Sequence, residues 1–345
     1  MEFLTPDTPA GVLIAFAACA AVIGVAGVRL SAVADRLADR TGLGEAVVGA
    51  VLLGAVTSLS GLTTSVTAAW NGLPELAVSN AAGGIAGQTF FLAVADLTYR
   101  RANLEHAAAS LANLIQGTVL GGCLTLAVLG AAAPTYAVGP LHPVSPLLVG
   151  FYVLGLRITQ RARTEPSWMP ARTPETRIDD PAQDDSGDAS TARLWGEFAA
   201  LGAVTAAAGF VIGRAGEGAI DVFSLSQSVT GAFLTALVTS LPELVTTVAA
   251  VRRGALTLAV GGIIGGNAFD VLFLAASDLA YTEGSIYAAI TDRQLFIIAL
   301  SLLMTTVLVM GLLRREKHGL GGVGFETVLL VLIYLGGAGA LIAMG

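Results

Sequence analysis

Apolar residues dominate long stretches of this chain, and polar residues gather in the segments between them. The apolar runs lie at roughly 9–28, 46–70, 76–98, 107–133, 145–160, 194–213, 226–251, 256–280, 294–313 and 322–344. A run of about 20 such residues crosses a hydrocarbon core of about 30 Å as a helix. The pattern therefore predicts an all-α polytopic membrane protein with ten transmembrane helices.

The composition strengthens this prediction. The chain is 54% hydrophobic and only 12% charged, whereas soluble domains carry about 25% charged residues. The formal net charge of −7 comes largely from loops, so it does not favour a nucleic-acid partner. Cys19 and Cys123 lie in apolar runs without the spacing of metal ligands, and no nucleophile, base and orienting group stand together as in an enzyme. The expected partners are the lipid bilayer and small cations.

The distribution of basic residues predicts the orientation in the membrane. A hydrophilic stretch at 161–193, rich in Asp, Pro and Ser, separates the fifth run from the sixth and is typical of a flexible loop. If the N-terminus lies outside, 16 of the 18 Lys and Arg residues are cytoplasmic, and only Arg214 and Arg293 are not. We therefore expect both termini outside and a cytoplasmic loop at 161–193, in the inner membrane of a prokaryotic cell.

The chain contains an internal repeat. The phrase TSLSGLTTS at Thr57 returns as TSLPELVTT at Thr239, and an offset of 182 aligns 25 identities in the 53 positions from 47 to 99 without a gap. Each copy contains five predicted spans, so the second enters the membrane upside down. Inverted repeats of this kind build secondary transporters with a site near the midplane. The predicted units are 1–160 (motif 47–99), the loop 161–193, and 194–345 (motif 229–281).

The second copy carries polar groups inside its spans. Thr239, Ser240 and Glu243 lie in the seventh run, where Pro242 removes a backbone donor and frees a carbonyl one turn earlier. Asp270 ends the sequence GGIIGGNAFD in the eighth run, whose glycines allow close helix approach. Carboxylates, hydroxyls and carbonyls are hard oxygen ligands, which suit Na⁺ or Ca²⁺.

The two mid-span acids need an explanation, because an ionised group there costs several kcal/mol or more unless it is paired. With no intramembrane Lys or Arg nearby, Glu243 and Asp270 require a cation or a proton. A purely structural alternative is that both are protonated and bond to each other. The hydroxyls alone have a plain alternative too, since Ser and Thr in membrane helices often bond their own preceding turn.

These motifs resemble the sodium/calcium exchanger membrane-domain family of the calcium/cation antiporter superfamily. TSLPELVTTVAA followed by LAVGGIIGGNAFD is similar to the second repeat motif of that family. VTSLSGLTTSVTAA with LAVSNAAGGIAGQTFF is similar to a diverged first repeat motif. The ten-span plan and the loop after the fifth span also agree, so the resemblance covers nearly the whole chain.

The resemblance implies a set of ion ligands from both repeats. The implied ligands are Thr239, Ser240, Glu243, the carbonyl of Ala236, Asn267 and Asp270 in the second repeat, and Thr57, Ser58, Gln88 and the carbonyl of Gly54 in the first. This chain departs from the family where Gly61 replaces the first-repeat acid and Ser60 its proline. Both carboxylates therefore come from one repeat.

The resemblance further implies a secondary active antiporter that exchanges Ca²⁺ for Na⁺ or H⁺ by alternating access. No resident cofactor is expected; Ca²⁺, Na⁺ and H⁺ are the candidate transported ions. A monovalent Na⁺/H⁺ antiporter is the alternative, because loss of an anionic ligand weakens Ca²⁺ binding. A channel or a non-transporting membrane sensor with a degenerate ion site is an alternative of another class.

Overall fold

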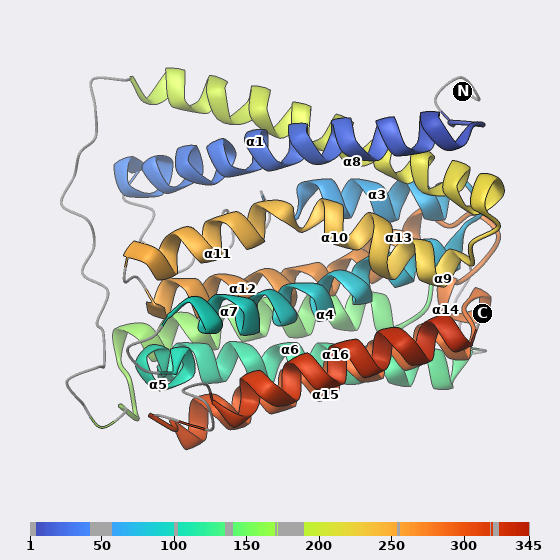
Figure 1. The fold of residues 1–345 in the computed structure, drawn as a ribbon. Coiled ribbons are helices and arrows are strands. Elements are labelled where there is room, and N and C mark those ends of the chain that lie inside the picture. Colours follow the sequence, from blue (N-terminus) through green and yellow to red (C-terminus); the bar gives the residue numbers. More distant parts are fainter. Residues whose placement is uncertain are drawn as a thin grey trace.

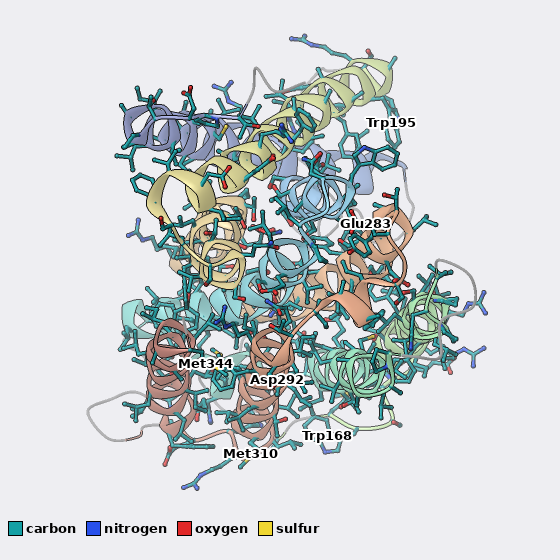
Figure 2. The ribbon with its side chains drawn as sticks, turned by 90° about the vertical axis from the view of Figure 1, so that its right-hand side faces the viewer. Trp168, Trp195, Glu283, Asp292, Met310 and Met344 are labelled. Atoms are coloured by element: carbon teal, nitrogen blue, oxygen red, sulfur yellow. The ribbon has the colours of Figure 1, made fainter. Side chains whose placement is uncertain are left out.

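A computed structural model describes residues 5–41, 57–99, 103–134, 141–169, 171, 190–253, 256–317, 319 and 324–344. Its helices run roughly side by side in one bundle, with the N- and C-terminal ends of the chain at the same end (Figure 1). Figure 2 looks along the bundle from this end, where Glu283 and Asp292 lie.

The helical elements follow the predicted two-part order. The first part contains α1 (Pro9–Thr41), α3 (Leu59–Trp70), α4 (Pro74–Thr98), α5 (Leu104–Ala108), α6 (Leu111–Ala132) and α7 (Val144–Thr164). The second part contains α8 (Thr191–Phe223), α9 (Gln227–Val229), the π-helix η4 (Thr230–Thr235), α10 (Ala236–Thr239), α11 (Leu241–Arg253), α12 (Leu256–Asp270), α13 (Leu272–Ala280), α14 (Ile286–Ala289), α15 (Asp292–Arg314) and α16 (Phe325–Ala343). We call the two ends of the bundle the α5 end and the α14 end, after the short helices found there (Figure 1).

The offset of 182 found in the sequence recurs in the structure. α1 and α8 each contain 33 residues, begin 182 positions apart, pack on each other and run in opposite directions (Figure 1). A Cβ on Gly27 of α1 would collide with the Pro242 ring, and a Cβ on Gly209 of α8 would collide with the Ser60 carbonyl. Gly27 corresponds to Gly209 and Ser60 to Pro242, so one close contact is made twice by inverted halves.

Helices lie at all ten predicted positions. Among the described residues, seven helices are long and apolar enough to cross a membrane, and a bent pair makes an eighth. The other two positions hold α3, which follows the undescribed residues 42–56, and α7, whose second half carries arginines. The predicted ends were wrong at α1, α7 and α8, which continue beyond 28, 160 and 213 and, for α7 and α8, into the predicted loop.

Two predicted spans are broken. The run 226–251 is a pair of helices bent by 48° at Ser240, with a π-helical turn just before the break. π-Helical turns are frequent at functional sites. The run 256–280 is interrupted at Val271, immediately after Asp270. Both interruptions fall at or beside predicted ligands, and the first of them changes the direction of the chain.

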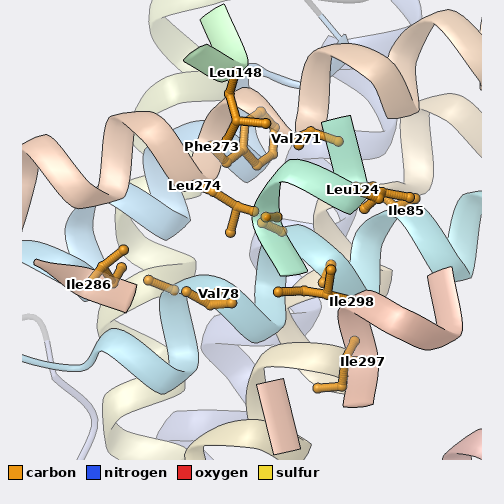
Figure 3. Close-up of a cluster of buried hydrophobic side chains, with 14 of the residues drawn as sticks. Val78, Ile85, Leu124, Leu148, Val271, Phe273, Leu274, Ile286, Ile297 and Ile298 are labelled. Atoms are coloured by element: carbon orange, nitrogen blue, oxygen red, sulfur yellow. The ribbon is translucent and has the colours of Figure 1, made fainter. Parts of the chain in front are cut away.

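The main apolar core joins the two repeats. Figure 3 shows Val78 and Ile85 of α4 and Leu124 of α6 beside Val271, Phe273 and Leu274 of the second repeat. Close backbone approach tightens this contact, because a Cβ on Gly83 would lie only 2.5 Å from the Ala232 Cα. Gly83 of the first repeat thus holds α4 against η4 beside the predicted ligands, whereas the close approach predicted for the glycines of the eighth run does not involve a neighbouring backbone.

Candidate cation-binding site

The predicted ligands that the structure describes gather around the broken seventh span. Glu243 opens α11 and Asp270 ends α12, and their side chains are only 5% and 2% exposed. α3 and α4 of the first repeat pack against this region and bring Thr57, Ser58 and Gln88 to it, all of them buried. Side chains from both repeats therefore converge on one enclosed place.

An amide links the two repeats there. Gln88 Nε2 donates to Asp270 Oδ2 at 2.7 Å and to the Ser240 hydroxyl at 3.2 Å. The Ser58 hydroxyl lies near the Asp270 carboxyl group, although it has no well-formed hydrogen bond. Since Ser58 corresponds to Ser240 and Gln88 to Asp270, these two contacts are related by the inversion of the repeats. The pseudo-twofold axis therefore passes through this site.

The site contains oxygen atoms that no described donor satisfies. Six buried oxygens lack a hydrogen bond: Glu243 Oε1, Glu243 Oε2, Asp270 Oδ1, Asn267 Oδ1, Gln88 Oε1 and Ser58 Oγ. Buried polar atoms are nearly always paired, and each unpaired one costs about 1–3 kcal/mol. Oxygen atoms of carboxylate, amide and hydroxyl groups are the donor set that hard cations prefer. The site is therefore chemically suited to a cation.

Other predicted ligands have different roles in the described structure. The Thr239 hydroxyl bonds the Ala236 carbonyl at 3.2 Å, and the Ser240 amide bonds the same oxygen at 3.0 Å. That carbonyl is thus engaged within its own helix. Thr239 therefore bonds the preceding turn, which was the structural alternative given for the hydroxyl groups. Thr57 lies beside Glu243. The predicted carbonyl of Gly54 lies outside the described residues.

Asn267 has a contact that the motif alone does not reveal. Its amide Nδ2 donates to the Thr89 hydroxyl of α4 at 3.0 Å, which leaves its Oδ1 unpartnered. Thr89 directly follows Gln88 on α4. Its position beside a predicted ligand is the sequence feature that could have identified it as part of the site. The hydrogen bond fixes the amide with its oxygen free to accept or to ligate.

Two glycines border the polar space. A Cβ on Gly84 would lie 3.7 Å from Ser240 Oγ and 4.0 Å from Asp270 Oδ2. A Cβ on Gly266, its counterpart in the second repeat, would lie 3.6 Å from Gln88 Oε1. A Cβ on Gly61, the counterpart of Glu243, would lie 2.9 Å from the Phe273 ring and 3.6 Å from Thr239 Oγ1. Phe273 therefore occupies the direction in which a side chain at position 61 would begin.

A bundle of inverted helical repeats with a buried oxygen site at their meeting point defines a membrane transporter. Residues 11–158 and 193–342 match the family described as sodium/calcium exchanger protein, and the chain belongs to this family. It is a transporter family rather than an enzyme family, and this chain is an integral membrane protein of the calcium/cation antiporter superfamily.

Curated relatives agree with this assignment. The chain is 27% identical over 319 residues to the putative antiporter CaxA of Alkalimonas amylolytica, covering 88% of this chain and 90% of CaxA. It is 33% identical to the inner membrane protein YrbG of Escherichia coli over 104 residues, or 31% of YrbG. It is 31% identical to the sodium/calcium exchanger MaX1 of Methanosarcina acetivorans over 115 residues, or 33% of MaX1.

Solved structures show the same fold at low sequence identity. An H⁺/Ca²⁺ exchanger CAX superposes with a TM-score of 0.68 at 14% identity, covering 96% of this chain and 86% of CAX. The sodium-calcium exchanger NCX_Mj superposes with a TM-score of 0.58 at 17% identity, covering 97% of both chains. The prediction of ten transmembrane helices in two inverted five-helix repeats is thereby confirmed.

Proposed function

We propose that this protein is an antiporter that moves Ca²⁺ across the membrane against Na⁺ or H⁺ by alternating access. The observation that carries this proposal is the set of six unpartnered buried oxygens contributed by both repeats. Glu243 and Asp270 supply two negative charges, which balance one divalent ion or two monovalent ones. The proposed ligands are these two carboxylates with Ser58, Gln88 and Asn267, and with Thr57 and Ser240 beside them.

The relatives support the ion class. MaX1 and NCX_Mj are described as sodium/calcium exchangers, and CAX as an H⁺/Ca²⁺ exchanger. A second candidate, monovalent Na⁺/H⁺ exchange, draws support from the amide at Gln88 and the glycine at Gly61. Together they leave the first repeat without a carboxylate in the central site, and Ca²⁺ affinity falls as the number of charged ligands falls.

We also propose the orientation given by the basic residues, with both termini outside and 161–193 in the cytoplasm of a prokaryotic cell. The proposed units are 1–160 and 194–345. The helices of each unit lie 182 positions from their counterparts, which supports this division. Inverted repeats allow the access path to alternate. The two halves are related by a pseudo-twofold axis, so exchanging their conformations opens the site to the other side of the membrane.

The test is flux measurement in proteoliposomes. Purified protein is reconstituted, and Ca²⁺, Na⁺ and H⁺ movements are followed under imposed gradients of each ion in turn. Uptake of Ca²⁺ driven by an outward Na⁺ or H⁺ gradient is the expected result. Na⁺ movement coupled to H⁺ with no Ca²⁺ movement would select the second candidate. Uncoupled flux would indicate a channel, and no flux with intact ion binding would indicate a sensor.

A further inference from the structure

Two aspartates outside the central site are tied into the fold in the same way. Asp96 ends α4 at the α5 end, and Asp278 ends α13 at the α14 end, 182 positions later. Leu104 N donates to Asp96 Oδ1 at 2.7 Å, and its counterpart Ile286 N donates to Asp278 Oδ1 at 2.8 Å. Both carboxylates are buried, because the short helix that follows folds back onto each of them.

The second oxygen of each aspartate is held equally symmetrically. The Thr327 hydroxyl donates to Asp96 Oδ2 at 2.7 Å, and its counterpart, the Ser145 hydroxyl, donates to Asp278 Oδ2 at 2.7 Å. Each aspartate thus fastens the short helix of its own repeat and the last helix of the other repeat to the end of a central helix. Asp278 is fully satisfied by these bonds together with the His142 amide and the Ser285 hydroxyl.

The symmetry breaks in the surroundings of Asp96. Glu105 and Glu326 stand beside Asp96 at the α5 end, whereas their counterparts near Asp278 are Tyr287 and Val144. Both glutamates are 0% exposed. All four of their side-chain oxygens lack a hydrogen-bond partner. Among the described residues, three carboxyl groups are therefore enclosed together around Asp96, whereas Asp278 is enclosed without another carboxyl group at the counterpart positions.

The described contacts of Arg314, Arg315 and His106 are with other groups. Arg314 pairs with Glu316 at 3.4 Å, and Arg315 donates to the carbonyls of His106 and Ala171. His106 Nδ1 contacts the Arg315 carbonyl at 2.7 Å. The Lys317 carbonyl accepts from Asn103, and the Glu316 carboxylate adds a further negative charge near Glu326. No described hydrogen bond from these groups reaches the Glu105 or Glu326 carboxyl oxygens.

Two carboxylates are both acceptors, so they can approach each other only with a proton between them. Glu105 and Glu326 lie within reach of such a bond. In the described part of the chain, no three His, Cys, Asp or Glu side chains are arranged to hold a metal ion. We infer that Glu105 and Glu326 form a proton-binding site at the α5 end, in which one shared proton joins α5 to the start of α16.

The electrostatics of Glu105 agree with this site. Glu105 lies in the short helix between the spans of α4 and α6. Burial, and after it the carboxylates of Asp96 and Glu326, raise the pKa of Glu105 well above its usual value. The folded protein therefore holds the proton at pH values where the unfolded chain has lost it. The stability that the proton provides is present at low pH and is lost as the pH rises toward the raised pKa.

Release of the proton charges the cluster and pushes α5 and α16 away from the end of α4. Gln88 lies eight residues earlier on α4, about 12 Å along the helix axis. Asp96, which stands beside the proton site, thus lies on the same helix as Gln88 of the central site. A change in pH at the α5 end therefore acts on the element that carries Gln88, without needing a change at Glu243 or Asp270.

The test uses infrared spectra of purified Glu243→Gln/Asp270→Asn protein, a background without the central carboxylates. We expect the infrared band of a protonated carboxyl group to persist well above the usual Glu pKa of about 4.3. Glu105→Gln and Glu326→Gln should each remove it, and Glu165→Gln, which changes an exposed glutamate, should not. A band that survives both Glu105→Gln and Glu326→Gln, or no band in the background protein, would overturn the inference.

Thermal unfolding provides a second readout, independent of ion transport. Between the two pKa values, each proton released makes the unfolding equilibrium constant rise by up to about tenfold per pH unit. Glu105→Gln should flatten this pH dependence and Glu165→Gln should preserve it. An equally steep dependence in Glu105→Gln would contradict the inference. A second contrary result is possible. If Ca²⁺ stabilises the background protein at fixed pH and Glu105→Gln abolishes that effect, the cluster binds a metal ion rather than a proton.

Discussion

Gln88 and Asp270 are counterparts in the two repeats, and they are hydrogen-bonded to each other at 2.7 Å. A residue can touch its own counterpart only near the axis that relates the two halves. The contact therefore marks where the inverted halves meet, and it pairs an amide from one half with a carboxylate from the other.

Gln88→Asp is expected to convert this pair into two carboxylates that repel each other when no cation is bound. The melting temperature should fall in the presence of a chelator and rise with Ca²⁺ by more than in the unmodified protein, by the linkage of binding to stability. Gln88→Leu is the matched control. It removes a hydrogen bond to a charged group, worth about 1.5–3 kcal/mol, without adding charge. Equal Ca²⁺ shifts in Gln88→Asp and Gln88→Leu would show that position 88 does not contact the ion.

Glu243→Gln and Asp270→Asn are each expected to reduce coupled exchange to background while the protein remains folded. Even partners one layer outside a metal site change its affinity by about 10–100-fold, so loss of a direct ligand should exceed that range. Proteoliposome flux and calorimetric Ca²⁺ binding measure the effect. Glu283→Gln, which changes an exposed glutamate outside the site, serves as the control. Normal flux in either site variant would remove that residue from the mechanism.

Gly83→Ala is expected to destabilise the protein, because its methyl group would lie 2.5 Å from the Ala232 Cα. Overpacking of this kind costs about 1–3 kcal/mol. Gly265→Ala is the same change at the counterpart position, where the nearest atom is Gln116 Nε2 at 3.6 Å. Melting temperatures of the two variants should therefore differ, with Gly83→Ala clearly lower. Equal values would mean that α4 and η4 separate without cost.

Gly61→Glu would restore an acid at the counterpart of Glu243, but its Cβ would meet the Phe273 ring at 2.9 Å. Alone, this change is expected to destabilise the fold. With Phe273→Ala it should regain stability and show a larger Ca²⁺-dependent rise in melting temperature, because affinity rises with ligand charge. Gly61→Gln/Phe273→Ala has the same shape without the charge. If both double variants respond alike to Ca²⁺, position 61 does not face the ion.

A cysteine introduced at position 186 reports the orientation. Ser186→Cys should resist a membrane-impermeant thiol reagent in intact cells and react after the cells are opened. The two native cysteines are buried and should stay silent. Labelling of Ser186→Cys in intact cells would reverse the proposed topology.

The carboxylates of the site were predictable because charge inside an apolar run is costly. Glu243 and Asp270 stand out for that reason, and the structure buries both. The offset of 182 showed which residues of the two repeats are equivalent, but it does not show whether two equivalent residues lie close together in the fold. The direct bond between Gln88 and Asp270 therefore could not be predicted, since it depends on where the axis passes.

Other features escaped prediction because they depend on tertiary contacts. α1 continues beyond its apolar run because Val33 and Leu37, one turn apart, are buried with Leu194 of α8. The Asp96 and Asp278 carboxylates lie near the ends of predicted spans, and the sequence does not reveal that partners distant along the chain enclose them. The Ala236 carbonyl illustrates the opposite case. This carbonyl already accepts two hydrogen bonds from residues close to it in sequence, the Thr239 hydroxyl and the Ser240 amide.

The contacts of Gly27 with Pro242 and of Gly209 with Ser60 have the character of an isologous interface, in which the same patch is used twice. A true homodimer built this way could change the charge of its central site only in steps of two, since every substitution would appear in both subunits. Two halves joined in one polypeptide escape that restriction. In this chain both central acids, Glu243 and Asp270, belong to one half, and their counterparts in the other half are a glycine and an amide.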